Sequence, residues 1–315
     1  MKRLLDLFRN QKLNIKFTFI IVLFIIVPLG ILASYLFYVM EKNVIDENVS
    51  YMDYTMKRNQ EYTVSKIDSI NMSTQFFLSD EALLEMLAKS QRDEEITVEE
   101  WLEFKDEKVS SLERLVNNNP VLYGVRVYSE NNSVQEMMPI LYQNERLHKQ
   151  EWANEEDYLG WNYNYTDNLF SKYTLNQERK LIGLVTSIYN DDNEKIGTIE
   201  AAMTMETMFP SIYESIENEW SFFYSEDGKF YLDENKEAPD TVLLQEIIAR
   251  IPDEKEIITE FYEGGQQELV LSYMPINELD GTLVCVKNIA DSVQNVQNIQ
   301  NIFVLAMAAL TALLA

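Results

Sequence analysis

The sequence predicts an α+β protein that an apolar helix near the N-terminus holds in a membrane. Three observations lead to this fold class. An uncharged run extends from Phe17 to Met40, and a helical pattern without proline or glycine follows it to about Leu78. Beyond Pro120 the apolar residues change to the period of strands, and turn residues separate these strands. We therefore expect a transmembrane helix, a long stalk helix and two antiparallel-sheet modules.

The apolar run at residues 17–40 follows a basic lead at residues 1–16. A helix rises about 1.5 Å per residue, so a run of this length crosses a hydrocarbon core of ~30 Å. The run continues into bulky residues such as Leu36 and Phe37, without the small-residue cleavage site of a secretory signal, so we expect a permanent anchor. Lysine and arginine predominate before the run and acidic residues after it, which predicts a cytoplasmic N-terminus and an extracytoplasmic position for residues 41–301.

The next segment, residues 41–80, predicts a stalk helix that rises from the membrane. Nine of its residues recur at spacings of mostly three and four, the period of one helix face. This seam packs either on the chain's own modules or on a second copy of the chain, and we favour the first. The seam consists of Val49, Met52, Met56, Asn59, Thr63, Ile67, Ile70, Thr74 and Phe77.

Residues 81–204 predict a membrane-distal module. Thr97 and Glu100 form a capping box at the start of a helix that ends near Asn117. Two pairs of antiparallel strands follow, with an aromatic, irregular stretch at residues 144–174 between the pairs. The first pair is predicted at residues 121–128 and 134–142, and the second at residues 180–189 and 195–203 across a turn at residues 190–194.

Residues 205–289 predict a smaller, membrane-proximal module. A proline in its first turn indicates a helix at residues 210–219, and Asp227-Gly228 predicts the turn of a β-hairpin. The hairpin strands at residues 221–224 and 230–232 are followed by a helix at residues 241–251 and by strands at residues 256–262, 267–274 and 282–287. Residues 290–301 predict an exit helix, and the uncharged run at residues 302–315 predicts the start of a second transmembrane helix, cut short at Ala315.

The composition excludes several classes of function. The chain has 52 acidic and 26 basic residues and a formal net charge of −26 at pH 7, which excludes nucleic acid as a partner. The single cysteine, Cys285, excludes an internal disulfide, and its place in a predicted strand indicates a small buried apolar residue. The single histidine, His148, has no second metal ligand near it in the sequence. We expect no catalytic residue, metal or cofactor in this region.

The aromatic stretch provides the candidate binding site. Large flat side chains together with a few polar groups are typical of a pocket that orients a small ligand. Aromatic faces with hydroxyl groups and an acid suit a sugar, whereas an arginine with an aspartate suits the zwitterion of an amino acid. The alternative is that these aromatic residues pack over the sheet edge as core. The candidate residues are Arg146, Trp152, Tyr158, Trp161, Tyr163, Tyr165 and Asp167.

Three local features carry a resemblance to a known family. They are the Pro28-Leu29-Gly30 sequence in the first span, the paired strands at residues 181–188 and 196–203, and the block at residues 268–289. With the order of parts, these features resemble the extracytoplasmic double-Cache region, two PAS-like modules, of LytS/YesM-like sensor histidine kinases. The resemblance implies a ligand in the distal module, a homodimer and a kinase domain after the second span. Amino-acid-binding relatives carry an arginine closely followed by Trp-Tyr, whereas five residues separate Arg146 from Trp152 here, and Ala153 replaces the tyrosine.

These observations favour the sensory portion of a transmembrane two-component histidine kinase in the cell membrane. It would bind a small extracellular solute, a sugar or another small molecule, and the full protein would phosphorylate a histidine and transfer the phosphoryl group to a cytoplasmic response regulator. One alternative is the double-Cache sensor of a chemotaxis receptor or a nucleotide cyclase. Another is a membrane-tethered binding or cell-wall protein without a signalling output.

Overall fold

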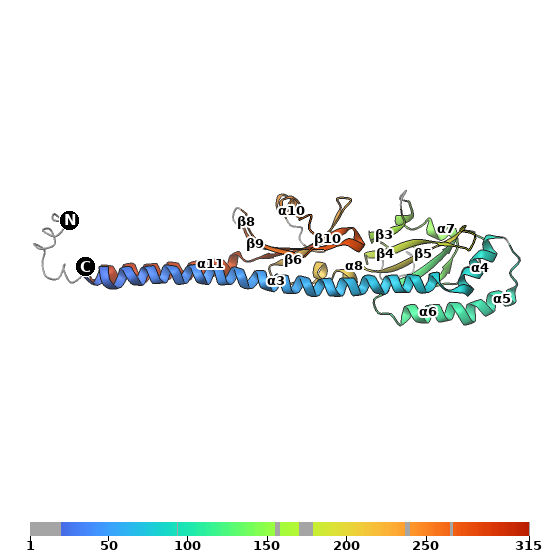
Figure 1. Cartoon of the computed structure of the whole chain (residues 1–315), viewed down its shortest axis with the longest axis horizontal. Helices are drawn as coiled ribbons and strands as arrows, with labels where there is room; N and C mark the ends of the chain where they lie inside the picture. The colour runs from blue at the N-terminus through green and yellow to red at the C-terminus, as the bar shows by residue number, and fades with distance from the viewer. Residues whose placement is uncertain are drawn as a thin grey trace, which may run out of the picture.

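The computed structural model describes residues 20–92, 94–154, 158–169, 179–236, 240–264 and 267–314. The molecule is elongated, and two sheet modules lie one after the other along a single long helix (Figure 1). The basic lead at residues 1–16 and the first residues of the predicted span lie outside the described residues. The predicted fold class, with apolar helices at both ends and two antiparallel-sheet modules, is confirmed.

The long helix is α3, Val27–Leu78, which a short π-helical segment, η1 at Val22–Ile26, precedes. The predicted membrane span and stalk are therefore one continuous helix. The seam of the stalk packs on the chain's own modules, as predicted, because Met52, Met56, Ile67, Ile70 and Phe77 are all buried against strands of both sheets. The helical spacing of the seam residues was enough to predict this buried face, because no proline or glycine interrupts the helix beyond Gly30.

The exit helix and the second apolar run also form one helix, α11 at Ala290–Leu314. Helix α11 runs back along the start of α3 (Figure 1). The rings of Phe37 and Phe303 meet edge to face, with their centroids 5.8 Å apart. The helical segments Val22–Leu78 and Ala290–Leu313 are both long and apolar enough to cross a membrane. The side chains in the most apolar part of each helix are largely exposed, as expected of surfaces that face lipid.

The membrane-distal sheet has the strand order β2-β1-β5-β4-β3. Its strands are β1 (Gly124–Ser129), β2 (Leu141–Tyr142), β3 (Gly160–Tyr165), β4 (Leu181–Tyr189) and β5 (Lys195–Thr204). The helical segments packed near α3 are α4 (Glu81–Gln91), α5 (Val98–Glu103), η2 (Phe104–Val109) and α6 (Ser110–Asn117). The predicted capping box is confirmed, because Thr97 Oγ1 accepts the Glu100 amide at 3.3 Å and a Glu100 carboxylate oxygen accepts the Thr97 amide at 2.8 Å.

Four expectations about the elements require correction. The sequence analysis missed α4, although Asp80 caps it by accepting the Leu83 amide at 3.0 Å. Residues 134–142 do not form an antiparallel neighbour of β1. Pro139 has no amide hydrogen, and the chain closes a tight turn between Met137 and Leu141, so that only Leu141–Tyr142 pairs with β1, in parallel.

The other two corrections concern the aromatic stretch and the predicted helix at residues 210–219. The aromatic stretch contains an edge strand, β3, with a register shift between Asn162 and Tyr165. The predicted helix at residues 210–219 is reduced to the single turn α9 (Pro210–Tyr213). Another single turn, α8 (Met205–Met208), precedes it. Glu214 is extended and Asn218 has a positive φ of 61°, so the chain leaves the helix and enters the next strand.

The membrane-proximal sheet is entirely antiparallel, with the order β7-β6-β10-β9-β8. Its elements are β6 (Glu219–Ser225), β7 (Phe230–Tyr231), α10 (Thr241–Ile248), β8 (Ile258–Gly264), β9 (Gln267–Ile276), η4 (Asn277–Leu279), β10 (Gly281–Asn288). The hairpin at Asp227-Gly228 and the three later strands are confirmed, and Gly228 has the positive φ, 83°, that the turn requires.

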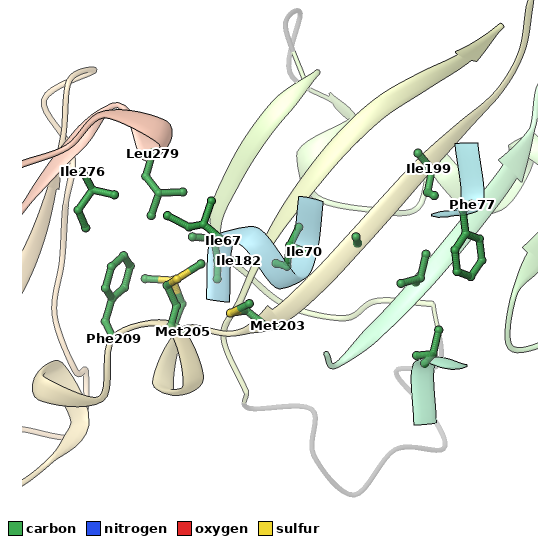
Figure 2. Packing of buried hydrophobic residues seen from close by; sticks show 14 of the residues in the cluster. Ile67, Ile70, Phe77, Ile182, Ile199, Met203, Met205, Phe209, Ile276 and Leu279 are labelled. Atoms are coloured by element: carbon green, nitrogen blue, oxygen red, sulfur yellow. The ribbon is translucent and has the colours of Figure 1, made fainter. Parts of the chain in front are cut away.

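One hydrophobic core connects the two modules through α3 (Figure 2). Ile67 and Ile70 of α3 contribute to the same buried cluster as Ile182 and Met203 of the distal sheet. Phe209, Ile276 and Leu279 extend this cluster into the proximal module. Helix α3 therefore packs against the cores of both modules.

Candidate functional site

A buried ionic cluster lies on the face of the distal sheet that points away from α3. Side chains alternate along a strand, so Val127 and Ile199 face the helices while Arg126 of β1 and Glu200 of β5 face the other side. The register places Arg126 directly opposite Glu200. Asp167, which follows β3, completes the cluster. The three side chains are only 8%, 1% and 6% exposed, respectively.

Hydrogen bonds hold the charged groups of this cluster in place. An Arg126 guanidinium nitrogen lies 2.5 Å from Asp167 Oδ2, and another lies 3.6 Å from Glu200 Oε2. The two oxygens of Glu200 accept the hydroxyl groups of Tyr128 at 2.8 Å and Tyr165 at 2.7 Å. A charge buried in this way is tolerated because each carboxylate has several donors.

Two more side chains, Tyr123 and Gln150, extend the network. The Tyr123 hydroxyl donates to Asp167 Oδ2 at 2.9 Å, and the other oxygen of Asp167 accepts the Leu169 amide at 3.2 Å. Gln150 Nε2 donates to the Tyr128 hydroxyl at 3.2 Å. The segment between β2 and β4 therefore supplies Gln150 and Asp167 above a sheet that supplies the remaining groups.

Electrostatics fix the protonation of the donors. Burial by itself lowers the pKa of Arg126. The electrostatic attraction of Glu200, Tyr128 and Asp167 is stronger, so the pKa of Arg126 is raised well above its usual value. Burial, and then Glu200, raise the pKa of Tyr128 and Tyr165 well above the usual value, and burial with Asp167 raises the pKa of Tyr123 to about 12. All three tyrosines are thus neutral donors at physiological pH. Two carboxylates against one guanidinium give the cluster a formal excess of one negative charge.

Aromatic rings cover the cluster. Trp152 is 3% exposed and meets Tyr128, Tyr158 and Tyr165 with ring centroids 6.3, 5.8 and 6.5 Å away. Its indole Nε1 has no hydrogen-bond partner among the described residues, and neither does the Thr198 hydroxyl oxygen, two residues before Glu200 on β5. A buried polar group without a partner is rare, so both atoms are available to a bound solute or water.

The structure brings some of the sequence-predicted residues together and separates others. Trp152, Tyr165 and Asp167 belong to the cluster or its cover, and Tyr158 stacks on Trp152. Arg146 does not belong to it, because the Arg146 side chain forms a two-pronged ion pair with Glu136 at 2.9 and 3.0 Å, at the short helix α7, Asn144–Leu147.

Trp161 and Tyr163 also lie outside the cluster, since they pack with the core that runs toward the proximal module. The Tyr163 ring contacts those of Phe223 and Tyr231, and its hydroxyl donates to the Leu279 carbonyl oxygen at 2.5 Å. Ligand binding by any of the seven predicted residues remains a prediction.

Sequence reasoning missed Arg126, Glu200, Tyr128, Tyr123 and Gln150. A signal was present, because Arg126 and Glu200 are each the only charged residue within an otherwise apolar strand segment, VLYGVRVY and GTIEAAM. A lone charge at such a position is expensive unless it is paired. The arginine that accompanies Asp167 is thus Arg126 and not Arg146.

The single histidine and the single cysteine of the chain lie outside the ionic cluster. His148 is exposed at the end of α7, and none of the described residues form a group of three or more metal-ligating side chains. Cys285 is buried in β10, as predicted, where its sulfur accepts the Ser221 hydroxyl at 3.0 Å.

No model of a known protein family matches the sequence, and no curated protein matches it. Several solved structures are similar. The extracellular domain of the putative histidine kinase vpHK1S-Z8 is 9% identical, with a TM-score of 0.47, over 78% of this chain and 96% of that chain. The ligand-binding domain of Mlp24 with asparagine is 9% identical, with a TM-score of 0.39, over 84% of this chain and 99% of that chain.

The ligand-binding domain of the Pseudomonas aeruginosa PAO1 amino acid chemoreceptor PctC, in complex with GABA, is 16% identical, with a TM-score of 0.39. The similarity extends over 75% of this chain and 99% of that chain. Because each TM-score is below 0.5, the assignment of the fold depends on the chain's own helices and strands.

Proposed function

We propose that the chain is the sensory portion of a transmembrane two-component sensor histidine kinase, with a double-Cache body that binds a small extracytoplasmic solute. The observation that carries this proposal is the buried cluster of Arg126, Asp167 and Glu200 beneath the aromatic cover. It lies in the module that is remote from α11 and from the apolar start of α3 (Figure 1). Aromatic side chains together with a few precisely placed polar groups are typical of a site that orients a small ligand.

The solute is small and polar. The formal negative excess of the cluster favours an amino group, whereas the tyrosine hydroxyls, the Trp152 indole and the acid also suit the hydroxyl groups of a sugar. Arg126 provides a counter-charge for a carboxylate, but two carboxylates already occupy it. An amine or a sugar is therefore favoured over a simple organic acid.

Signal transmission needs a solute that binds one arrangement of the helices better than another. A difference of ~1–3 kcal/mol changes the balance of two arrangements by about 5- to 150-fold. The continuous helix α3 connects the distal core directly to the membrane span, and α11 returns beside it. In a homodimer, two such helix pairs can rotate or slide against each other.

A panel of solutes tests the binding proposal. The full chain in nanodiscs is heated with neutral sugars, amino acids and simple amines, and its unfolding is followed by tryptophan fluorescence. A ligand at 100 times its Kd stabilises the folded state by about 2.7 kcal/mol, which raises the midpoint of unfolding. We expect at least one solute to do so in the wild type and not in Glu200→Gln.

Glu194→Gln, at the exposed β4–β5 turn, is the matched control and should keep the effect. The proposal would be rejected if no solute stabilised the chain, or if Glu200→Gln were stabilised as much as the wild type. The output is tested separately by the residues that follow Ala315 in the gene. A phosphoacceptor histidine with a nucleotide-binding domain supports the kinase, whereas a cyclase domain, long heptad hairpins or an early stop would replace it with one of the alternatives.

A further inference from the structure

A cleft lies between the two modules and borders the cluster described above at Trp152 and Tyr165. It has a volume of about 580 Å³. One wall is the edge strand β3 of the distal sheet, and the other is formed by β7 and the turns that precede β7 and β10. Both β3 and β7 are outer strands of their sheets, so the cleft separates two sheet edges.

Aromatic side chains from both modules line this inter-module cleft. They are Trp152, Trp161, Tyr163, Tyr165 and Tyr231. The ring centroids of Tyr163 and Tyr231 are 5.7 Å apart, and the bond from Tyr163 to the Leu279 carbonyl fixes the ring between the modules. The walls are therefore held in place before a ligand arrives, which lowers the entropic cost of binding.

The polar residues that line the cleft are mostly acidic. Glu151, Glu226, Asp227 and Asp280 oppose a single cation, Lys229, which forms an ion pair with Asp227 at 2.9 Å. The formal charge of the lining is thus minus three. Burial and then Asp280 raise the pKa of Tyr163 above its usual value, so this part of the aromatic wall is neutral.

We propose that the inter-module cleft binds a small organic cation, a primary or quaternary amine. Electron-rich ring faces attract ammonium groups, and the carboxylates supply the counter-charge at short range. The cleft volume falls in the range of about 300–1,000 Å³ that is typical of small-molecule sites. A bare divalent metal ion fits less well, because the described residues contain no group of three or more metal ligands.

An occupied cleft would brace the two modules against each other. A ligand that contacts both walls favours the arrangement in which they are close, and so acts on the balance that the distal solute also controls. The charge of this site does not depend on the distal cluster. Glu200 and Arg126 do not line the cleft, so their substitution leaves the formal charge of its lining unchanged.

Putrescine and choline are the probes for this proposal. The full chain is placed in nanodiscs of neutral lipid, which removes competing anionic headgroups, and each probe is titrated by calorimetry and by tryptophan fluorescence. We expect saturable binding by at least one probe, a fluorescence change from Trp152 and Trp161, and an affinity that falls as salt rises. Trp161→Leu should weaken binding at least threefold by removing one ring face.

Asp227→Asn combined with Asp280→Asn should weaken binding at least tenfold. Both substitutions suit the backbone, since Asn-Gly is a favoured hairpin turn and asparagine tolerates the φ of 44° at position 280. Asp191→Asn with Asp192→Asn, in the exposed β4–β5 turn, makes the same change in net charge and should leave the affinity unchanged.

Glu200→Gln separates the two sites, because it should abolish the effect of the distal solute and keep the binding of the amine. The cleft proposal is overturned if neither probe saturates, or if the control pair loses as much affinity as Asp227→Asn with Asp280→Asn. It is also overturned if a neutral sugar such as glucose competes with the amines at equal affinity.

Discussion

The charged residues that matter most in this chain are those that the strands place inside. Arg126 and Glu200 lie opposite each other because β1 and β5 pair in that register, and Asp167 reaches them from the covering segment. A buried charge that loses its partner is strongly destabilising, whereas exposed ion pairs contribute little. Arg126 is an arginine of the first kind, and Arg146 has a partly exposed ion pair.

This contrast gives a prediction. Arg126→Met leaves Asp167 and Glu200 buried without a counter-charge and should lower the free energy of unfolding by about 3–5 kcal/mol. Arg146→Met removes a partly exposed pair with Glu136 and should cost at most about 1 kcal/mol. Urea unfolding of the full chain, followed by near-ultraviolet circular dichroism, compares the two. Equal losses would mean that the cluster is not the buried ionic centre described above.

The tyrosines predict a dependence on alkaline pH. The pKa of Tyr123 is raised to about 12, by burial and then by Asp167, above a value near 10 in the unfolded chain. The unfolded chain therefore loses this proton first, so the contribution of Tyr123 to stability is complete below pH 10 and is lost as pH rises through 12. Tyr123→Phe should reduce the decline in stability over this window. An unchanged decline would place the Tyr123 hydroxyl in water.

Three of the candidate residues could be predicted to lie together because they share one aromatic segment. Trp152, Tyr165 and Asp167 are within that segment, and the structure brings them together. Arg126 and Glu200 could not be paired from the sequence, because 74 positions separate them and only the strand register makes them neighbours. Arg146 is a candidate from the sequence because it is close to the aromatic residues along the chain.

At the scale of elements, the patterns that repeat were predicted well. The seam of α3 and the strands β4, β5, β9 and β10 follow regular spacing, and the structure confirms them. The elements that were missed or misjudged are short and depend on contacts from elsewhere. Strand β2 has two residues, β3 contains a register shift, and α9 is a single turn.

The close approach of strands β5 and β1 in the distal sheet gives another prediction. A Cβ atom added at Gly197 of β5 would lie 2.7 Å from the Tyr128 carbonyl oxygen, so Gly197→Ala forces the backbone of β1 to shift. We expect a loss of about 1–3 kcal/mol in the free energy of unfolding. Gly124→Ala, in the neighbouring strand, is the control because nothing lies within 4 Å of the new atom.

Gly124→Ala should be neutral or stabilising by up to about 1 kcal/mol, since alanine reduces the entropy of the unfolded chain. Thermal unfolding of both variants by differential scanning fluorimetry measures the difference. If Gly197→Ala were as stable as Gly124→Ala, the tight pairing of β5 with β1 would be wrong.

At the scale of the whole molecule, the arrangement is a two-module body connected at both ends to apolar helices. This order could be predicted from the sequence, because hydrophobic runs, turns and periodicity fix it. The junction between the modules could not, because it depends on single contacts such as Tyr163 with Phe223 and with the Leu279 carbonyl. Those contacts join the edge of the distal sheet to the proximal module.

The most direct test of solute sensing is the geometry of the two apolar helices with and without solute. Phe37 and Phe303 are in contact, so Phe37→Cys with Phe303→Cys, in a Cys285→Ser background, should form a disulfide under mild oxidation in membranes. Tyr35→Cys with Phe303→Cys is the control, since Tyr35 is 64% exposed and lies on another face of α3. We predict that a saturating solute from the panel changes the rate of cross-linking at least threefold, and that Glu200→Gln removes this change. An unchanged rate with the solute bound would contradict the claim that binding in the distal module reaches the membrane.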